Sequence, residues 1–181
     1  MASIVTKTGD TGMTGLYGAQ RVPKDSARIQ ACGTVDELNA ILGIVLAHTE
    51  LPAMMREKIN AIQHGLFRVG GDLATPLEVK AKQDRISPTH VLDLEISIVA
   101  LEALLSPQKS FLLPGGTPAS AHLHHARTVC RRAERLVVTL QREELINDQV
   151  LIFLNRLSDY LFVAARKMNM DAGVGDVEVK Y

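Results

Sequence analysis

Four charged side chains on one predicted helix have a spacing that could bind an anion. At about 100° per residue, one face of a helix over residues 118–142 carries Arg127, Arg131, Glu134 and Arg135. Three arginines on one face repel one another unless an anion lies between them, and the planar guanidinium suits phosphate oxygens. The alternative is a solvated face on which Glu134 bridges neighbouring arginines. Taken alone, the spacing favours that alternative.

A second candidate phosphate site lies in the segment at residues 3–25, which is rich in glycine and threonine. Lys7, Arg21 and Lys24 supply positive charge within it. A glycine-rich backbone beside a lysine can cradle phosphates through its N–H groups. The segment is not a Walker A loop, because the lysine precedes the glycines and no GK[ST] occurs. The alternative is a flexible N-terminal arm, which glycine density alone slightly favours.

Candidate metal ligands are few. Asp10 could take part in a magnesium site, directly or through water, because magnesium prefers oxygen ligands. His122, His124 and His125 also suggest a metal, but residues two apart on a helix do not share a face. No Glu-x-x-His pair, H-E-x-x-H or G-x-S-x-G motif occurs. We therefore expect these histidines to lie on a helix surface or at an interface.

Polar positions on two further predicted helices add weaker signals. Asn155 and Asp159 lie one turn apart beside a leucine stripe. Such a pair is usually the wet face of a helix, but near the arginine face it could recognise a nucleotide. Asp36, Asn39 and Gly43 lie off the apolar stripe of the first helix, which hints at a specific contact there.

Composition narrows the possible functions of the 181-residue chain, which is most simply one domain. Twenty basic and 20 acidic side chains give no general attraction to nucleic acid or membrane, and the lack of tryptophan argues against a base-stacking platform. Cys32 and Cys130 match no metal spacing, so we expect buried free thiols. The apolar run from Ala40 to Ala47 is too short to span a bilayer, and no signal peptide is recognised. We expect a cytoplasmic protein.

Apolar periodicity predicts five helices with short links, which is an all-α fold of the antiparallel, ferritin-like up-down type. The predicted helices cover residues 28–49, 52–73, 88–105 and 118–142, and a fifth follows residue 147. Ser87 and Thr117, each followed by proline, are predicted helix starts, and Asn147 is a third. The charged stretch at 75–85 is predicted to be a mobile loop, and residues 171–181 a glycine-containing tail.

Six motifs occur in a fixed order along the chain. They are TKTGDTGMT at 6–14, Lys24, GTVDELNA at 33–40, FLLPGG at 111–116, ARTVCRRAER at 126–135 and FLNRLSDYLF at 153–162. Together they resemble the PduO-type ATP:cob(I)alamin adenosyltransferases. The resemblance runs from residue 6 to about residue 168, and the loop at 75–86 and the tail add no support to it.

The resemblance implies a single domain over residues 1–181, in which an ATP-binding segment at 1–26 orders on binding. The helical bundle would cover 27–170 and the tail 171–181. It also implies a homotrimer with active sites between subunits and a requirement for Mg²⁺ and ATP. The residues implied around the triphosphate are Thr6, Lys7, Thr8, Gly9, Asp10, Thr14 and Lys24. Those implied for the rest of the ATP are Arg131, Arg132, Ala133, Glu134, Arg135 and Asn155.

Next to the corrin, the resemblance implies that Asp36 and Arg127 form a pair that joins subunits. It places Phe111 under the lower face of the corrin, whereas its ordinary interpretation is a core anchor. Together with Arg131, these are the residues implied to be catalytic. A cobalamin reductase and a B12-dependent enzyme are the candidate macromolecular partners.

The implied reaction is attack of the cobalt of cob(I)alamin, obtained from cob(II)alamin, on the 5′ carbon of ATP. It yields adenosylcobalamin and triphosphate. Because cob(I)alamin is a very strong nucleophile, the protein needs no general base and must only align the reactants and stabilise the leaving triphosphate. This agrees with clustered Arg, Lys and Gly residues and no acid–base dyad. Two alternatives stay open, namely an ATP-binding regulatory bundle without corrinoid chemistry and a structural helical oligomer that binds neither ligand.

Overall fold

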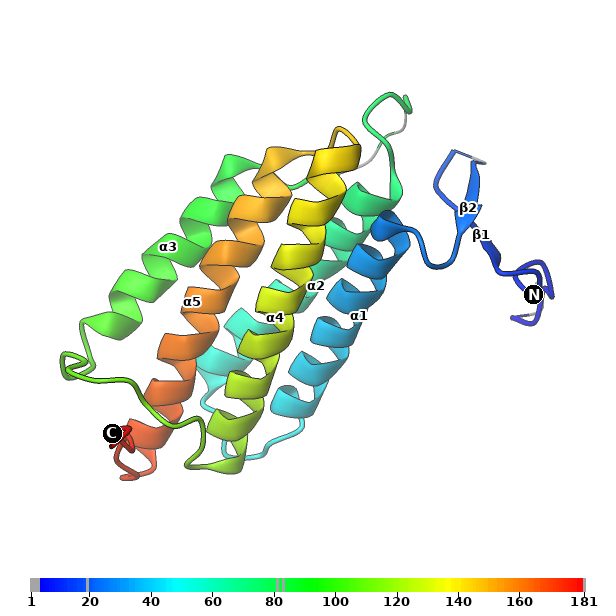
Figure 1. The fold of residues 1–181 in the computed structure, drawn as a ribbon. Coiled ribbons are helices and arrows are strands. Elements are labelled where there is room, and N and C mark those ends of the chain that lie inside the picture. The colour runs from blue at the N-terminus through cyan, green and yellow to red at the C-terminus, as the bar shows by residue number, and fades with distance from the viewer. Residues whose placement is uncertain (1–3, 19, 81, 83, 181) are drawn as a thin grey trace.

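Five helices form an up-down bundle in the computed structural model, which describes residues 4–18, 20–80, 82 and 84–180 (Figure 1). Each helix runs antiparallel to the one before it, so the predicted all-α bundle is confirmed. The helices are α1 (Ala27–Leu46), α2 (Ala53–Ala74), α3 (Pro88–Glu102), α4 (Pro118–Glu143) and α5 (Asp148–Asp171).

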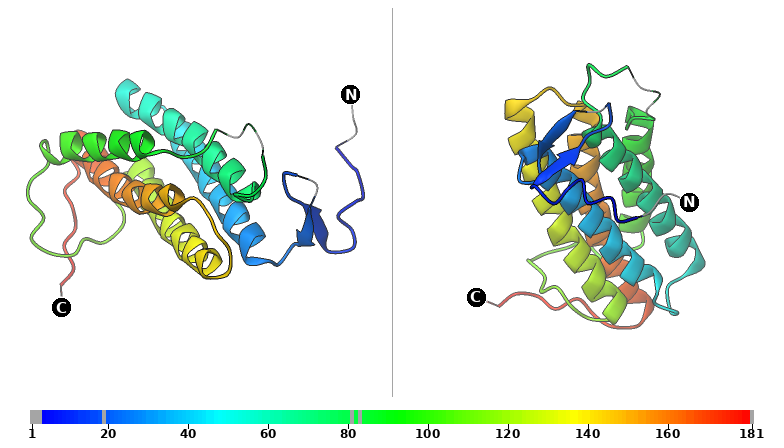
Figure 2. Two further views of the ribbon diagram at one scale, coloured as in Figure 1. Left: turned by 90° about the horizontal axis from the view of Figure 1, so that it is seen from above. Right: turned by 90° about the vertical axis from the view of Figure 1, so that its right-hand side faces the viewer.

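Helix α4 is the central element, because it packs against both α1 and α5. Helix α2 lies on the outer side of α1, and α3 lies along α5 (Figure 2). The buried side of α4 includes Ala126, Cys130, Ala133 and Val137, as the helical periodicity predicts. The face with the arginines is therefore turned away from the core.

The predicted helix starts are confirmed by their capping contacts. The Thr117 hydroxyl accepts a hydrogen bond from the Ser120 backbone N–H at 3.1 Å, and the Asn147 side chain accepts one from the Gln149 N–H at 3.1 Å. At the start of α3, the Ser87 N–H donates to His90 Nδ1 at 3.1 Å. These contacts satisfy N–H groups that the first helical turn leaves unpaired.

The N-terminal segment is not helical, as predicted, but it contains a small β-hairpin that the sequence did not reveal. Strands β1 (Met13–Gly15) and β2 (Arg21–Pro23) pair antiparallel, with Thr14 opposite Val22. The hairpin lies beyond the first turn of α1 and projects away from the bundle in Figure 1 and in the left view of Figure 2.

Two expectations about individual side chains need correction. His124 is buried in α4 and meets Phe162 edge-on at 6.0 Å, whereas we expected a surface or interface position. Burial, and secondarily the charge of Arg127, lower the pKa of His124. Cys130 is a buried free thiol as expected, but Cys32 is only half-buried. Burial still raises the pKa of Cys32 to about 11.

Helix α1 is long and apolar enough to meet simple criteria for a membrane span. Its apolar side chains, however, pack against α2 and α4 inside the bundle. Val35, Leu38, Leu42 and Val45 are almost fully buried there. The core of the bundle therefore accounts for the hydropathy of this helix.

Candidate functional site

The arginine face of α4, defined as Arg127, Arg131 and Arg135, carries positive charge that the described residues do not neutralise. Among them, none of the three guanidinium groups has a carboxylate oxygen within 4.0 Å. Arg131 and Arg135 are exposed, and Arg127 is half-buried. An anion would relieve the mutual repulsion of these groups.

Glu134 does not bridge the arginines, so the alternative of a self-neutralised face is wrong for this part of the chain. Its Oε1 instead accepts a hydrogen bond from Asn155 Nδ2 on α5 at 2.9 Å. The Oδ1 atom of Asn155 in turn accepts one from Arg156 Nη1 at 2.8 Å. The structure thus brings together Glu134 and Asn155, two of the residues implied for ATP, at the edge of the arginine face.

Asp159 lies one turn further along α5, next to the same group. Its pKa is raised, mainly by burial, although the charge of Arg156 opposes the shift and that of Glu134 adds to it. Arg156 Nη1 lies 3.9 Å from the Asp159 carboxylate, and Arg156 Nε donates to Glu95 on α3 at 2.8 Å. Arg156 therefore supplies the positive charge nearest to this polar end of the site.

Arg127 has a donor without an acceptor. Its Nε is buried and has no hydrogen-bond partner among the described residues. The guanidinium lies 5.8 Å from the centre of the Phe162 ring, a distance at which a cation is attracted to an aromatic face. Burial and the nearby charge of Arg131 lower the pKa of Arg127. Buried donors in proteins are usually paired, with a protein group, a ligand or an ordered water molecule, so this nitrogen is free to bind one of them.

Phe162 is a residue that the sequence reasoning missed. A signal was present, because Asn155, Asp159 and Phe162 recur at intervals of four and three residues and so share a face of α5. That face meets the arginine face through the contacts of Asn155 with Glu134 and of Phe162 with Arg127.

Two predicted ATP-site positions are separated from the arginine face. Arg132 forms an ion pair with Glu37 of α1, and both side chains are about half exposed. Ala133 is fully buried on the core side of α4. Successive residues of a helix point about 100° apart, so neither side chain shares the direction of Arg131.

In the N-terminal segment, two basic side chains contact the glycine-rich turns. Arg21 Nη2 donates to the Thr8 carbonyl at 2.6 Å and to the Met13 carbonyl at 3.2 Å, which folds residues 8–13 back onto the hairpin. Lys24 lies so close to Gly9 that a Cβ atom there would come within 2.9 Å of Lys24 Nζ. The Lys24 ammonium group therefore lies directly against the Gly9 backbone, which brings positive charge to a turn with exposed N–H groups.

The remaining predicted residues of this segment surround the same turns. The hydroxyl groups of Thr6 and Thr8 form a hydrogen bond of 3.0 Å. Lys7, between them, has a positive φ of 56°, which is uncommon for a residue other than glycine. Thr14 pairs within the hairpin. Asp10 is exposed, and the described residues hold no group of three or more His, Cys, Asp or Glu side chains that could bind a metal alone.

Asp36 lies on the exposed side of α1 and has no hydrogen bond or ion pair among the described residues. It borders a pocket of about 320 Å³ between α1 and α2, where Gly70 and Gly71 supply no side chains. Asn39 lines the same pocket, and its Oδ1 is buried without a partner. The face that the sequence marked as polar therefore combines an unpaired carboxylate with an unpaired acceptor.

Phe111 is 71% exposed, so it is not a core anchor within the chain. The tail holds its backbone, because the Val179 N–H donates to the Phe111 carbonyl at 2.8 Å and the Leu113 N–H to the Val177 carbonyl at 2.8 Å. The turn that follows is fixed from α5, where Asn169 Oδ1 accepts from the Thr117 N–H at 3.0 Å. Phe111 is thus an exposed aromatic side chain on a braced backbone.

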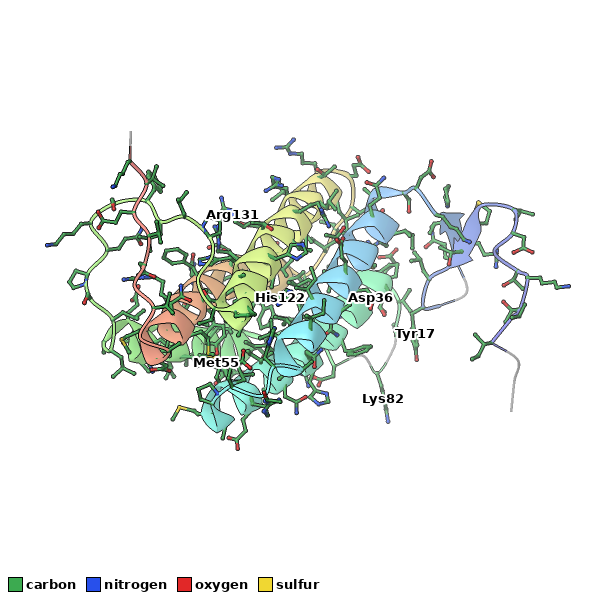
Figure 3. All side chains as sticks on the ribbon, turned by 90° about the horizontal axis from the view of Figure 1, so that it is seen from below. Tyr17, Asp36, Met55, Lys82, His122 and Arg131 are labelled. Atoms are coloured by element: carbon green, nitrogen blue, oxygen red, sulfur yellow. The ribbon has the colours of Figure 1, made fainter. Side chains whose placement is uncertain are left out.

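Within one chain, the two phosphate-binding candidates do not meet. Arg131 lies along the middle of α4, whereas Tyr17 marks the hairpin region beyond the start of α1 (Figure 3). Asp36 lies on α1 between these two labelled positions in that view.

Comparison with known proteins shows the family to which the chain is related. The family model described as cobalamin adenosyltransferase matches residues 4–168. A corrinoid adenosyltransferase of Bacillus subtilis is 47% identical, over 97% of this chain and 91% of the relative. A cobalamin adenosyltransferase of Cupriavidus metallidurans is 42% identical, over 98% and 94%.

Solved structures give the same result. A variant PduO-type ATP:corrinoid adenosyltransferase from Lactobacillus reuteri, complexed with cobalamin and ATP, superposes with a TM-score of 0.94. The two chains are 39% identical, and the match covers 98% of this chain and 97% of that one. The chain therefore belongs to the cobalamin adenosyltransferase family.

Proposed function

We propose that the protein transfers the 5′-deoxyadenosyl group of ATP to cob(I)alamin, forming adenosylcobalamin and releasing triphosphate. The observation that carries this proposal is the arginine face of α4. Its three guanidinium groups lie on one helix and repel one another, and they have no carboxylate partner among the described residues. Family membership explains this charge, because the PduO-type structure named above is complexed with cobalamin and ATP.

The triphosphate would lie against the N-terminal segment. Lys7, Lys24 and the backbone N–H groups around Gly9 supply donors there, and Arg21 fixes the turns from which they project. Magnesium fits this region, because it uses one or two carboxylates together with substrate phosphates, and Asp10 offers an exposed carboxylate. Bound there, magnesium would neutralise charge on the leaving triphosphate.

The remainder of the ATP would lie against α4 and α5, where Arg131 and Arg135 are exposed and Asn155 is oriented by Glu134. Arg131 is the residue to which we assign stabilisation of the leaving group. The chain needs no general base, because the reduced cobalt is itself the nucleophile. Its tasks are alignment of the reactants and preorganised positive charge.

The corrin would lie near Asp36, Arg127 and Phe111. The exposed ring of Phe111 offers an apolar surface for one face of the macrocycle, and its braced backbone keeps that surface in place. An apolar side chain at this position would exclude an axial base or water from the cobalt.

We further propose a homotrimer with its active sites between subunits. Two observations support it: the hairpin and the arginine face lie apart within one chain, and Asp36 and the Arg127 Nε lack partners among the described residues. A neighbouring copy could satisfy all of these groups at once, with Asp36 of one subunit paired to Arg127 of the next.

The chemistry of the reaction also indicates which reactions must supply its substrate and use its product. It consumes a cobalt(I) corrinoid, so a reductase must supply that substrate, and the product suits a B12-dependent enzyme. We propose the cytoplasm as the compartment of this reaction.

Spectral titration tests the proposal. The protein is mixed with reduced cobalamin, with and without MgATP, and the corrinoid absorbance is followed. We expect binding in both cases and conversion to the adenosylcobalamin spectrum only with MgATP. A corrinoid spectrum that the protein leaves unchanged with and without MgATP would contradict the proposal. A separate ATP-binding measurement then distinguishes the regulatory bundle, which binds ATP, from a structural oligomer, which binds neither ligand.

A further inference from the structure

A buried carboxylate joins three elements at the hairpin end of the bundle. Asp72, in the last turn of α2, has a side chain that is only 1% exposed. It forms an ion pair with Arg85, and its Oδ2 accepts from the Ile86 N–H at 3.0 Å and from Asn147 Nδ2 at 2.6 Å. A buried charge persists only where such partners compensate its lost hydration. The cluster therefore fixes the end of α2 against the approach to α3 and the start of α5.

Arg85 also closes the loop that leaves α2. Its Nη2 donates to the Thr75 carbonyl at 3.1 Å and to the Pro76 carbonyl at 3.2 Å. Because Arg85 itself lies at the far end of this loop, it holds both ends together. The expectation of a mobile loop at 75–85 thus does not describe its base, although residues 81 and 83 lie outside the described residues.

The base of this loop carries the N-terminal segment. The Tyr17 N–H donates to the Ala74 carbonyl at 3.0 Å. Gly18, at a φ of +103°, packs so closely on Val79 that a Cβ atom would lie 3.1 Å from a Val79 γ carbon. Val79 is itself held by a turn, since its N–H donates to the Pro76 carbonyl at 3.1 Å.

We propose that Arg85, through Asp72 and the 75–79 turn, positions the N-terminal segment for ATP. Arg85 is a positioning residue, because it acts through Ala74 and Val79 and not on the nucleotide. The inference rests on the proposed role of that segment in binding triphosphate. Its physical basis is preorganisation: a fixed base for the hairpin reduces the conformational freedom lost when ATP binds.

The test compares Arg85→Gln with the matched control Arg68→Gln. Arg68 on α2 forms an ion pair with Asp84, the residue before Arg85 in the loop. This pair lies at the surface, because the Asp84 side chain is 74% exposed. We expect Arg85→Gln to raise the KM for ATP roughly tenfold, as when the binding-competent arrangement falls to about one-tenth of the population. The affinity for cobalamin and kcat at saturating ATP should stay near wild type, and Arg85→Lys should restore part of the loss.

Amide hydrogen exchange supplies a readout that does not depend on activity. Residues 13–18 and 20–23 should exchange faster in ligand-free Arg85→Gln than in wild type or Arg68→Gln. Val79→Ala removes the packing under Gly18 without touching the Asp72 cluster. It should therefore also raise the KM for ATP and speed the exchange of the hairpin, and it replaces Arg85→Gln as the test if that variant does not fold.

Unchanged ATP KM and unchanged exchange in a folded Arg85→Gln protein would overturn the inference, as would an equal effect of Arg68→Gln. If Arg85→Gln does not fold, unchanged readouts in Val79→Ala overturn it. A wild-type protein without ATP-dependent transfer would reject the proposed function instead, and the exchange experiment would still decide whether Arg85 holds the hairpin.

Discussion

Arg131 is the residue through which the arginine face acts most directly in this account. It is exposed and has no ion pair among the described residues, so Arg131→Ala should leave the fold intact. Loss of a charge-assisted contact to phosphate is worth about 1.5–3 kcal/mol, which lowers kcat/KM roughly 10- to 100-fold or more. Steady-state kinetics and circular dichroism would measure both effects. The control is Arg142→Ala in the last turn of α4, and near-normal turnover in folded Arg131→Ala would exclude the assigned role.

Asp36 and Arg127 belong together if the subunits meet as proposed. Removal of either partner leaves the other charge uncompensated in a partly buried site. Each single variant, Asp36→Arg and Arg127→Asp, should therefore lose more activity and more trimer than the double variant with the charges exchanged. Activity and sedimentation velocity would measure the three proteins. Additive losses in the double variant would show that the side chains do not interact.

Phe111 should act through the axial position of the cobalt. An axial donor stabilises the oxidised metal. Excluding this donor leaves cob(II)alamin four-coordinate and therefore easier to reduce. Phe111→Ala should still bind ATP but should form much less of the four-coordinate species, and turnover from cob(II)alamin should fall. Electron paramagnetic resonance of the MgATP-bound protein measures this species, with the similarly exposed Leu104→Ala as control. Equal amounts in Phe111→Ala and wild type would mean that the ring only packs.

At the residue scale, the sequence predicted what helical spacing alone determines. The common direction of Arg127, Arg131 and Arg135 follows from the period of 3.6 residues. Helical spacing does not predict the unpaired Nε of Arg127 or the contact of Arg127 with Phe162. Both depend on how α4 and α5 are rotated against each other. The burial of His124 was missed for the same reason.

At the scale of elements, the N-terminal segment is expected to respond to the nucleotide. Its glycines broaden the free conformations, and triphosphate would supply partners for its N–H groups. Saturating MgATP should therefore slow amide exchange over residues 6–24 more than over α3, which serves as the internal control. Identical exchange with and without MgATP would contradict the assignment of this segment to ATP.

Local signals predicted the helices well and the links less well. The caps at Thr117 and Asn147 use side chains within three residues of the helix start, so the sequence contained the whole motif. The strands β1 and β2 have three residues each, too few to show a period of two. The anchoring of the loop at 75–85 depends on Asp72 and Asn147, and contacts between residues so distant in sequence leave no periodic signal.

At the scale of the whole molecule, the bundle could be predicted from five amphipathic stretches with short links, and the active assembly could not. The two candidate phosphate-binding regions lie apart within one chain, and helical periodicity carries no information about contacts between copies. The trimer therefore came from the resemblance and remains a proposal, which the unpaired groups on α1 and α4 support.

In the proposed reaction, the cobalt–carbon bond forms as the bond between the 5′ carbon and triphosphate breaks. The most direct measurement is the stoichiometry of products from cob(I)alamin and MgATP, with adenosylcobalamin followed by its light-sensitive absorbance and triphosphate by ion chromatography. We expect one triphosphate for each adenosylcobalamin, with neither product in the absence of corrinoid. Release of ADP and phosphate, or disappearance of ATP without a light-sensitive corrinoid, would contradict it.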